Sequence, residues 1–349
     1  MGFLENTGLK LLRLSKPELA HNIAIKALNL GLAPKPEVSI FENLKTSICG
    51  LKLDNPIGLA AGFDKNAEAV DPLLKCGFGF IEVGAITPEP QPGNPKPRLF
   101  RLPKDQAVIN RFGFNNLGME MASVRLARRS SKGVVGINLG ANKNSKDFSE
   151  DYIKGIKFFS TIASYITINI SSPNTPGLRN LEVLENLDIL LDKINNLDRE
   201  DLLIKIPILL KISPDLEPDN LKYLCKKVLS SKINGLIISN TTISRDSIST
   251  DIDEEGGLSG KPLFDISTKQ LRLAYKYTNG QIPLIGVGGV DSAETAYEKI
   301  KNGASLIQLY TGLVYNGPNL IKDINKDLSS LIERDGYSNI SEAVGVEVN

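Results

Sequence analysis

Two adjacent serines, Ser171 and Ser172, stand in the stretch NISSPNTPGLR (169–179), at the end of an apolar run. A serine at the end of a strand can act as a nucleophile, but it then usually needs a histidine base beside it. The chain has one histidine, His21, and it lies near the N-terminus. The surrounding residues must therefore indicate which other chemistry a serine could perform here.

Lysine and asparagine side chains occur at the ends of several apolar runs. Lys65 and Lys211 would point inward with few acids to neutralise them, so an anionic ligand would be their partner. A flavin ring is one such ligand, because it acquires negative charge on reduction. Asparagine amides both donate and accept hydrogen bonds, so a group of them could bind a planar ring that carries imide and carboxylate groups. A single lysine of this kind is more often ion-paired, and a single asparagine is more often a turn residue. Here five asparagines occur at such positions: Asn110, Asn138, Asn169, Asn174 and Asn240.

A glycine pair, Gly288 and Gly289, follows another apolar run in GVGGV. Glycines let backbone N–H groups approach an anion closely, although one pair can also be a simple tight turn. The residues at strand ends include no facing pair of carboxylates, which disfavours glycosidase chemistry. They include no cluster of metal ligands either, and we expect no metal.

Eight short apolar runs rich in β-branched residues recur along the chain, with segments of helical periodicity between them. Near-continuous apolar runs are typical of strands buried on both faces of a parallel sheet. Eight such units predict a (β/α)8 TIM barrel, in which the residues at the carboxyl ends of the strands form the active site. A doubly wound sheet is the alternative; the runs are 55–63, 78–87, 134–140, 165–171, 207–213, 233–241, 282–290 and 304–312.

Two segments fall outside this repeat. Residues 1–36 contain two amphipathic helical stretches, 3–14 and 17–32, with five basic and two acidic residues. Such a pair can lie in a membrane interface, or it can dock as a cap on the barrel bottom. Residues 88–116 are proline-rich and too long for an ordinary loop, so we expect a functional loop at the active-site end. The predicted domains are therefore 1–36 and 37–349.

The overall composition is that of a globular protein, with 41% hydrophobic and 23% charged residues over 349 positions. A net charge of +1 gives no reason to expect nucleic-acid binding. The three cysteines are far apart, which disfavours disulfides and zinc sites. Neither a signal peptide nor a transmembrane run is evident, so we expect the protein in the cytoplasm or at the cytoplasmic face of the cell membrane. We also expect it to be a monomer.

Several stretches together resemble the sequence blocks of dihydroorotate dehydrogenase, in particular its membrane-associated, quinone-using class (class 2). The resemblance runs from about residue 3 to 335, and the stretches are AAGFDKNAE, PRLFRLPKDQAVINRFGFNN, GINLGANK, NISSPNTPGLR, ISNTT, GGLSGKPL, IGVGGV and QLYTG. It implies an FMN-containing barrel that oxidises dihydroorotate to orotate in pyrimidine synthesis. Electrons would then pass to a quinone such as ubiquinone, and residues 1–36 would form the membrane and quinone-tunnel domain.

The resemblance also implies roles for individual residues. Ser172 would be the catalytic base, and we expect Thr175 to carry the proton onward while Phe114 closes over the site. His21 and Arg101 would lie near the quinone head group. The substrate residues would be Lys65, Asn110, Arg111, Phe112, Gly113, Phe114, Asn169, Asn174, Asn240 and Thr241. The FMN residues would be Ala61, Gly62, Lys65, Ala85, Asn138, Asn169, Lys211, Ser239, Gly260, Gly289, Tyr310 and Thr311.

Two residues depart from the usual pattern of this family. Ala85 stands where a hydroxyl residue usually contacts FMN, and Ser239 replaces a usual threonine. Three other functions remain as alternatives. A 2-hydroxy acid oxidase would need a histidine at a strand end, and the soluble class of dihydroorotate dehydrogenase would carry cysteine in place of Ser172. The third is a ligand-binding barrel without catalysis.

Overall fold

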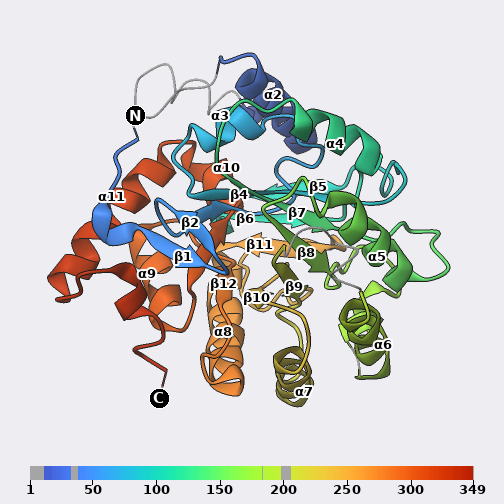
Figure 1. The fold of residues 1–349 in the computed structure, drawn as a ribbon. Helices are drawn as coiled ribbons and strands as arrows, with labels where there is room; N and C mark the ends of the chain where they lie inside the picture. The colour runs from blue at the N-terminus through green and yellow to red at the C-terminus, as the bar shows by residue number, and fades with distance from the viewer. Residues whose placement is uncertain (1–11, 33–37, 183, 198–205, 349) are drawn as a thin grey trace.

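Eight parallel strands close into a barrel in the computed structural model, which describes residues 12–32, 38–182, 184–197 and 206–348. Around the barrel the order is β10, β12, β13, β3, β4, β7, β8 and β9 (Figure 1). Each strand falls within one of the eight apolar runs, so the predicted (β/α)8 barrel is confirmed. The strands are β3 (Ile57–Leu59), β4 (Phe80–Ile86), β7 (Val134–Leu139), β8 (Tyr165–Asn169), β9 (Ile208–Ile212), β10 (Gly235–Ile238), β12 (Leu284–Val287) and β13 (Leu306–Leu309).

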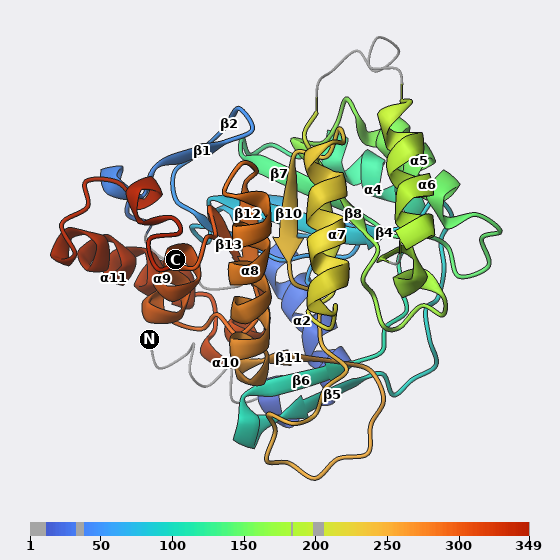
Figure 2. The ribbon, with the colours of Figure 1, turned by 90° about the horizontal axis from the view of Figure 1, so that it is seen from below.

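Helices surround this barrel and cover the outer face of its strands (Figures 1 and 2). Their starts follow local sequence. Asp147 accepts hydrogen bonds from two backbone N–H groups at the start of α5, and Ser292 forms a capping box with Thr295 at the start of α9. The helices are α3 (Val70–Leu74), α4 (Gly118–Ala127), α5 (Phe148–Phe159), α6 (Leu184–Asn195), α7 (Pro218–Leu229), α8 (Phe264–Thr278), α9 (Ala293–Lys301), α10 (Thr311–Asn316) and α11 (Leu320–Arg334).

A small hairpin closes the amino-terminal end of the barrel. Its strands are β1 (Thr46–Ile48) and β2 (Leu51–Leu53), and the turn between them uses positive φ angles at Cys49 and Gly50. Leu53 packs here with Phe80 and other apolar side chains from the starts of the strands. This hairpin therefore occupies the barrel bottom, where the docked-cap alternative placed residues 1–36.

The segment 88–116, predicted as a functional loop at the active-site end, does reach the cavity, but it also contains two strands of a second sheet. This segment contains β5 (Leu99–Leu102) and β6 (Ala107–Asn110), and β6 also pairs with β11 (Gly257–Gly260). The three strands lie side by side outside the barrel (Figure 2). The prolines around these strands disfavoured a strand prediction from the sequence. The strand that completes the sheet comes about 150 residues later, and partners so far apart leave no local pattern.

The N-terminal helix α2 (Pro17–Asn29) confirms the second predicted amphipathic helix. It packs on α3 and β5 and buries only Ile25 and Leu28 fully. Arg98 holds it to the barrel through Glu18, with 2.8 Å between Arg98 Nη2 and a Glu18 carboxylate oxygen. The predicted first helix lies mostly outside the described residues, which begin with a helical stretch at 12–14.

Candidate active site

One large cavity, with a volume of about 790 Å³, connects the carboxyl ends of the barrel strands with helix α2. Its wall takes residues from most barrel strand ends, from the sheet of β5, β6 and β11, and from α10. At the α2 end the wall is apolar, with Ala20, Ile23, Ala24 and Ala27 among its residues. A cavity of this size lies toward the upper limit for small-molecule sites, so it has room for more than one ligand.

The barrel interior beneath this cavity holds a buried carboxylate, Glu82 on β4. It accepts hydrogen bonds from Asn138 Nδ2 at 2.8 Å, Tyr165 Oη at 3.0 Å, Thr167 Oγ1 at 2.9 Å and Gln308 Nε2 at 3.0 Å. These residues come from β7, β8 and β13, so Glu82 ties four strands together. Sequence analysis missed it, because an acidic residue inside an apolar run gives no indication of its partners.

Glu82 also sets the direction of a chain of amides that leads to the cavity. Asn138 turns its NH2 group toward the Glu82 oxygen and presents its own oxygen to the next residue. Asn169 Nδ2 donates to that oxygen at 3.1 Å, and Asn240 Nδ2 donates to Asn169 Oδ1 at 3.2 Å. Asn169 and Asn240 both line the cavity, and Glu82, which lies outside the cavity wall, therefore determines how their amides are oriented.

Lys211 at the end of β9 is buried, lines the cavity, and makes no hydrogen bond to any described residue. Burial lowers the pKa of its ammonium, and Glu82 acts in the opposite direction. A buried cation without a hydrogen-bonding partner is costly unless a ligand completes the site. This side chain therefore indicates an electron-rich or anionic group in the cavity.

The two serines that follow β8 differ in their contacts. Ser171 Oγ donates to Asn169 Oδ1 at 3.2 Å and accepts from Asn240 Nδ2 at 3.0 Å. Ser172 lines the cavity, and its Oγ accepts the backbone N–H of Asn174 at 3.3 Å. The Ser172 hydroxyl proton has no acceptor among the described residues. Of the two, only Ser172 can offer its O–H group to a ligand.

Arg179 fixes the backbone that carries these serines. Its Nε donates to the carbonyl oxygen of Ser171 at 3.0 Å, and its Nη2 donates to that of Thr241 at 3.0 Å. An ion pair with Asp215, 2.9 Å between Nη1 and the carboxylate, holds the guanidinium in place. The loops after β8 and β10 are thus joined through one side chain, which preorganises Ser172 opposite Thr241.

Lys65 lies in the loop after β3, where its Nζ donates to the carbonyl oxygen of Gly62 at 2.7 Å. The ammonium also lies 4.2 Å from the centroid of the Phe112 ring. Burial is the main cause that lowers the Lys65 pKa to about 8. A carboxylate bound next to it would restore the charged form and gain a charge-assisted hydrogen bond.

Glycines form the wall at the ends of β11 and β12. Gly260, Gly288 and Gly289 have φ angles of +100°, +111° and +75°. Residues with a side chain adopt this backbone conformation only with strain. A Cβ on Gly289 would collide with Phe264, and one on Gly260 would collide with the backbone at Gln106. These positions leave backbone exposed to the cavity, as an anion site requires.

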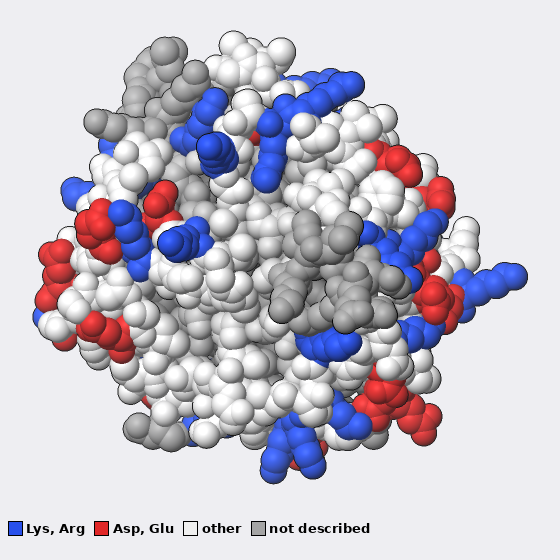
Figure 3. Space-filling model, viewed as in Figure 1, with Lys and Arg blue, Asp and Glu red and all other residues white. Residues whose placement is uncertain are grey.

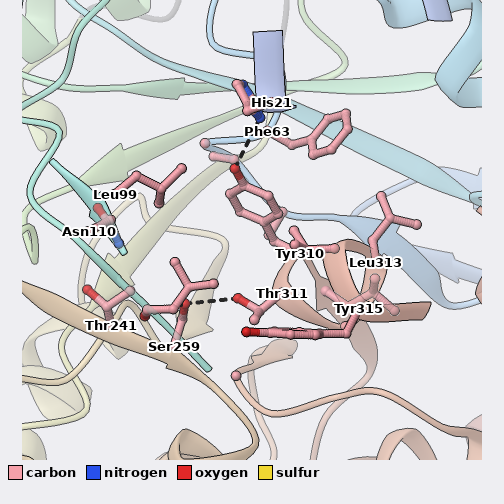
Figure 4. A pocket seen from close by; sticks show the side chains of 18 of the residues that line it. His21, Phe63, Leu99, Asn110, Thr241, Ser259, Tyr310, Thr311, Leu313 and Tyr315 are labelled. Atoms are coloured by element: carbon pink, nitrogen blue, oxygen red, sulfur yellow. Dashed lines mark hydrogen bonds between the residues drawn. The ribbon is translucent and has the colours of Figure 1, made fainter. Parts of the chain in front are cut away.

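The single histidine lies at the other end of the cavity, on α2. His21 Nδ1 is 3.4 Å from the Tyr310 hydroxyl, and both rings meet Phe63 edge-to-face with centroids 5.5 Å apart (Figure 4). Burial, with a smaller contribution from Lys65, lowers the His21 pKa to about 3. The imidazole is therefore neutral at physiological pH. Arg101 binds the carbonyl oxygens of Leu12, Arg13 and Ser15, so it anchors the chain just before α2.

Most of the predicted site residues line the cavity, but three do not. The Arg111 side chain pairs instead with Glu254 at 2.5 Å, outside the wall. Asn138 lies one layer behind, between Glu82 and Asn169. Thr175 is buried, and its Oγ1 has no hydrogen-bond partner in the described part of the chain. The other predicted residues all belong to the wall, including Ala61, Gly62, Ala85, Gly113, Phe114, Ser239 and Thr311.

Some wall residues were not predicted from the sequence. Ser259 on β11 shares a hydrogen bond of 2.9 Å with Thr311 and closes the wall between the small sheet and α10 (Figure 4). Asn115 lines the cavity with an Oδ1 that is buried and unpaired. Its place in the stretch FGFNN, beside Phe114, was the only indication that the sequence offered.

Comparison with known proteins agrees with this architecture. The family model described as dihydroorotate dehydrogenase matches residues 43–332. The chain belongs to the dihydroorotate dehydrogenase family. Two relatives are both named dihydroorotate dehydrogenase (quinone). The protein from Parvibaculum lavamentivorans is 48% identical over 342 residues, covering 97% of each chain. The protein from Brucella anthropi is 49% identical over 350 residues, covering 97% of this chain and 95% of its own.

Solved dihydroorotate dehydrogenases share the fold over nearly the whole chain. Ligand-free dihydroorotate dehydrogenase (DHODH) from Eimeria tenella superimposes with a TM-score of 0.89 at 38% identity, covering 95% of this chain and 99% of its own. The complex of the same enzyme with ferulenol gives a TM-score of 0.87 at 38% identity and covers 95% of each chain. This member of the dihydroorotate dehydrogenase family thus matches these relatives and solved structures over 95–97% of its length.

Proposed function

We propose that this chain is a quinone-dependent dihydroorotate dehydrogenase that oxidises dihydroorotate to orotate, a step of pyrimidine synthesis. One observation supports this most strongly: Ser172, Lys65 and Lys211 line a single cavity that continues to helix α2. A proton-transfer group, two cations and an apolar outlet are the parts that this reaction needs. The names of the relatives give the same activity.

The residues of the cavity fit FMN. Lys211 is a buried cation without a hydrogen-bond partner among the described residues, as expected beside the ring edge of a flavin. Gly260, Gly288 and Gly289 line the cavity at positive φ angles and have no room for a Cβ against their packed neighbours, so their backbone can face a phosphate at this wall. Ala85 has no hydroxyl to offer, so it would contact the cofactor only through its backbone and methyl group.

The substrate would lie among Lys65 and the amides. Lys65 would bind its carboxylate, and Asn169 and Asn240 already have orientations fixed by Glu82. Asn174 Nδ2 donates to Asn110 Oδ1 at 3.3 Å, so these two amides face each other across the loop after β8. The remaining donors and acceptors can bind the ring imide. Thr241 completes the wall on this side.

The reaction removes a proton from one ring carbon and a hydride from its neighbour. Bound FMN would accept the hydride and later supply the electrons for quinone reduction. Ser172 would take the proton as its own hydroxyl proton moves on, because a serine is too weak a base to retain it. Thr175 is the proposed next carrier, since its buried Oγ1 has no hydrogen-bond partner within the described ranges. Phe114 lines the same cavity as Ser172 and would exclude bulk water.

The quinone would enter along α2. Residues 1–36 would form the entry domain and residues 37–349 the catalytic barrel. His21 touches Tyr310 at the end of β13, so the α2 helix reaches the predicted flavin site directly. Arg101 anchors the chain before α2 and lines the same cavity. An apolar wall from Ala20 to Ala27 suits a hydrophobic quinone such as ubiquinone.

Exposed apolar side chains on α2 and directly beside it support peripheral membrane binding. Leu14, Leu30 and Leu32, which flank the helix, are 85%, 74% and 75% exposed, and Leu19 and Ile23 on the helix are also exposed. Lys and Arg side chains stand along the edge of the molecule where α2 lies (Figure 3). Within the described ranges, no helix is both long and apolar enough to cross a bilayer. We propose a monomer that lies on the cytoplasmic face of the cell membrane.

The test is a visible spectrum of the purified full-length chain. The proposal expects a flavin band that dihydroorotate bleaches and that a quinone restores, while fumarate and NAD do not. Restoration by fumarate or NAD would assign the chain to the soluble class, and a colourless protein that binds no added FMN would leave only a ligand-binding barrel. Deleting residues 1–36 should abolish quinone reduction and spare bleaching. Intact quinone turnover after this deletion would refute the entry domain.

A further inference from the structure

Lys299 on α9 is a lysine that the proposed mechanism does not use, although it is completely buried. Its Nζ donates to Ser267 Oγ at 2.8 Å and to Thr268 Oγ1 at 2.9 Å, and it lies 4.8 Å from the centroid of the Phe264 ring. It forms no ion pair with a carboxylate of the described residues. Burial lowers its pKa to about 7, while Glu298 and Asp265 act weakly in the opposite direction.

With a pKa of about 7, Lys299 is only partly charged near neutral pH while its partners are hydroxyls and a ring, and an anion nearby would hold it in the ammonium form. Hydroxyl oxygens satisfy its hydrogen bonds but do not neutralise its charge, and an uncompensated buried charge costs free energy. An aliphatic side chain of similar length could fill the same space without that cost. The presence of a lysine therefore points to an anion that enters the neighbourhood of α9.

The nearest ligand wall is the glycine loop after β12. Ser267 Oγ, which accepts from Lys299, is also 3.3 Å from the carbonyl oxygen of Gly288. A Cβ placed on Gly286, two residues earlier, would lie 3.2 Å from Lys299 Cδ. Lys299 thus lies directly behind the glycines that line the cavity.

Other charges at this wall are already used. Lys261, which lines the cavity next to Gly260, is paired with Asp291 at 3.3 Å. A phosphate monoester bound at the glycines carries up to two negative charges near neutral pH. Backbone N–H groups contribute only partial charges, so a full positive charge behind them would have a strong effect in this water-poor interior.

We propose that Lys299 is the buried counter-charge of the phosphate group bound at Gly288 and Gly289. This inference rests on the proposed FMN site. Lys299 would act through space and through Ser267, without touching the phosphate, and is therefore a positioning and electrostatic residue. Because of Lys299, the affinity for FMN would depend on the phosphate group and not only on the flavin ring.

The experiment compares two flavins that differ only in that phosphate. Full-length chain is stripped of flavin, and FMN or riboflavin is titrated by fluorescence quenching. We expect Lys299→Met to weaken FMN binding by about tenfold or more and riboflavin by no more than about twofold. Lys301→Met is the matched control: Lys301 lies on the same helix but pairs with Glu347, and its loss should change neither affinity.

Each other outcome is informative. Equal weakening of both flavins by Lys299→Met, or no weakening of either, would overturn the inference, because a structural role has no preference for phosphate. Lys299→Gln, which can still donate to Ser267, covers the case in which the methionine variant does not fold, and it should show the same selective loss of FMN. A wild-type chain that does not prefer FMN to riboflavin would instead refute the proposed phosphate site itself.

Discussion

His21 on α2 lies with its Nδ1 3.4 Å from the hydroxyl of Tyr310 at the end of β13. This contact joins the N-terminal helix to the barrel at the predicted flavin site. In the proposed function, this only histidine of the chain serves the quinone half of the reaction, and the described contacts of Ser172 do not include it. The proposal assigns the two half-reactions to different parts of one cavity, so substitutions should separate them.

Replacing His21 by alanine should slow quinone reduction by about tenfold and leave bleaching by dihydroorotate unchanged, because the loss corresponds to one buried hydrogen bond and its packing. Stopped-flow spectroscopy measures both steps. Because the His21 pKa is about 3, its imidazole stays neutral from pH 5 to 8, and this residue should add no titration step there. Asn22→Ala, at the next and exposed position, is the control. Equal slowing of both half-reactions would contradict the assignment.

Replacing Ser172 by alanine should slow flavin reduction by about 10²- to 10⁴-fold, the usual range for loss of a positioned proton-transfer group. Flavin content should not change, because Ser172 has no proposed contact with FMN. Ser172→Cys should recover part of the rate with a pH profile shifted to lower pH, since a thiol loses its proton more easily than a hydroxyl. Wild-type reduction by the alanine variant would refute Ser172 as the proton acceptor.

The affinity for dihydroorotate should depend on the charge of Lys65. Its folded-state pKa is about 8, so the ammonium is charged below that pH and progressively neutral above it. We therefore expect the wild-type KM to rise as pH increases beyond about 8. Lys65→Met should raise KM by about 10- to 100-fold and remove this pH dependence. Lys75→Met, which removes an exposed lysine after α3, should behave like wild type. A wild-type KM that stays flat from pH 7 to 10 would count against this role.

Glu82 should be a major determinant of stability. A glutamine there would place an NH2 group against the donors of Asn138, Tyr165, Thr167 and Gln308, so at least one buried hydrogen bond would be lost. We expect Glu82→Gln to lower the free energy of unfolding by about 2–4 kcal/mol, as measured by urea denaturation of the flavin-free chain. Glu120→Gln, on the exposed surface of α4, should change it by less than about 0.5 kcal/mol. Similar stabilities for the two variants would show that the network is not needed.

Local patterns were sufficient for the barrel and for much of the cavity wall. A strand buried on both faces needs a run of apolar residues, so each barrel strand can be predicted from its own run without knowledge of its neighbours. All eight runs therefore contained barrel strands, and Lys65, Ser172, Lys211 and Gly289 reached the cavity because they follow or end those runs. The stretch 17–32 likewise indicated α2 by its own periodicity.

The tertiary structure decided what depends on residues far apart in the chain. The pairing of β6 with β11 and the contacts of Glu82 join segments separated by many residues, and no local pattern encodes such partners. It also decided that Arg111 turns to Glu254 and that Lys299 lies behind the glycine loop. The sequence by itself determined which elements form and which residues stand at their ends. Side-chain direction, buried partners and the continuity of the cavity with α2 were decided only by packing, because each is set by the neighbours that folding brings together.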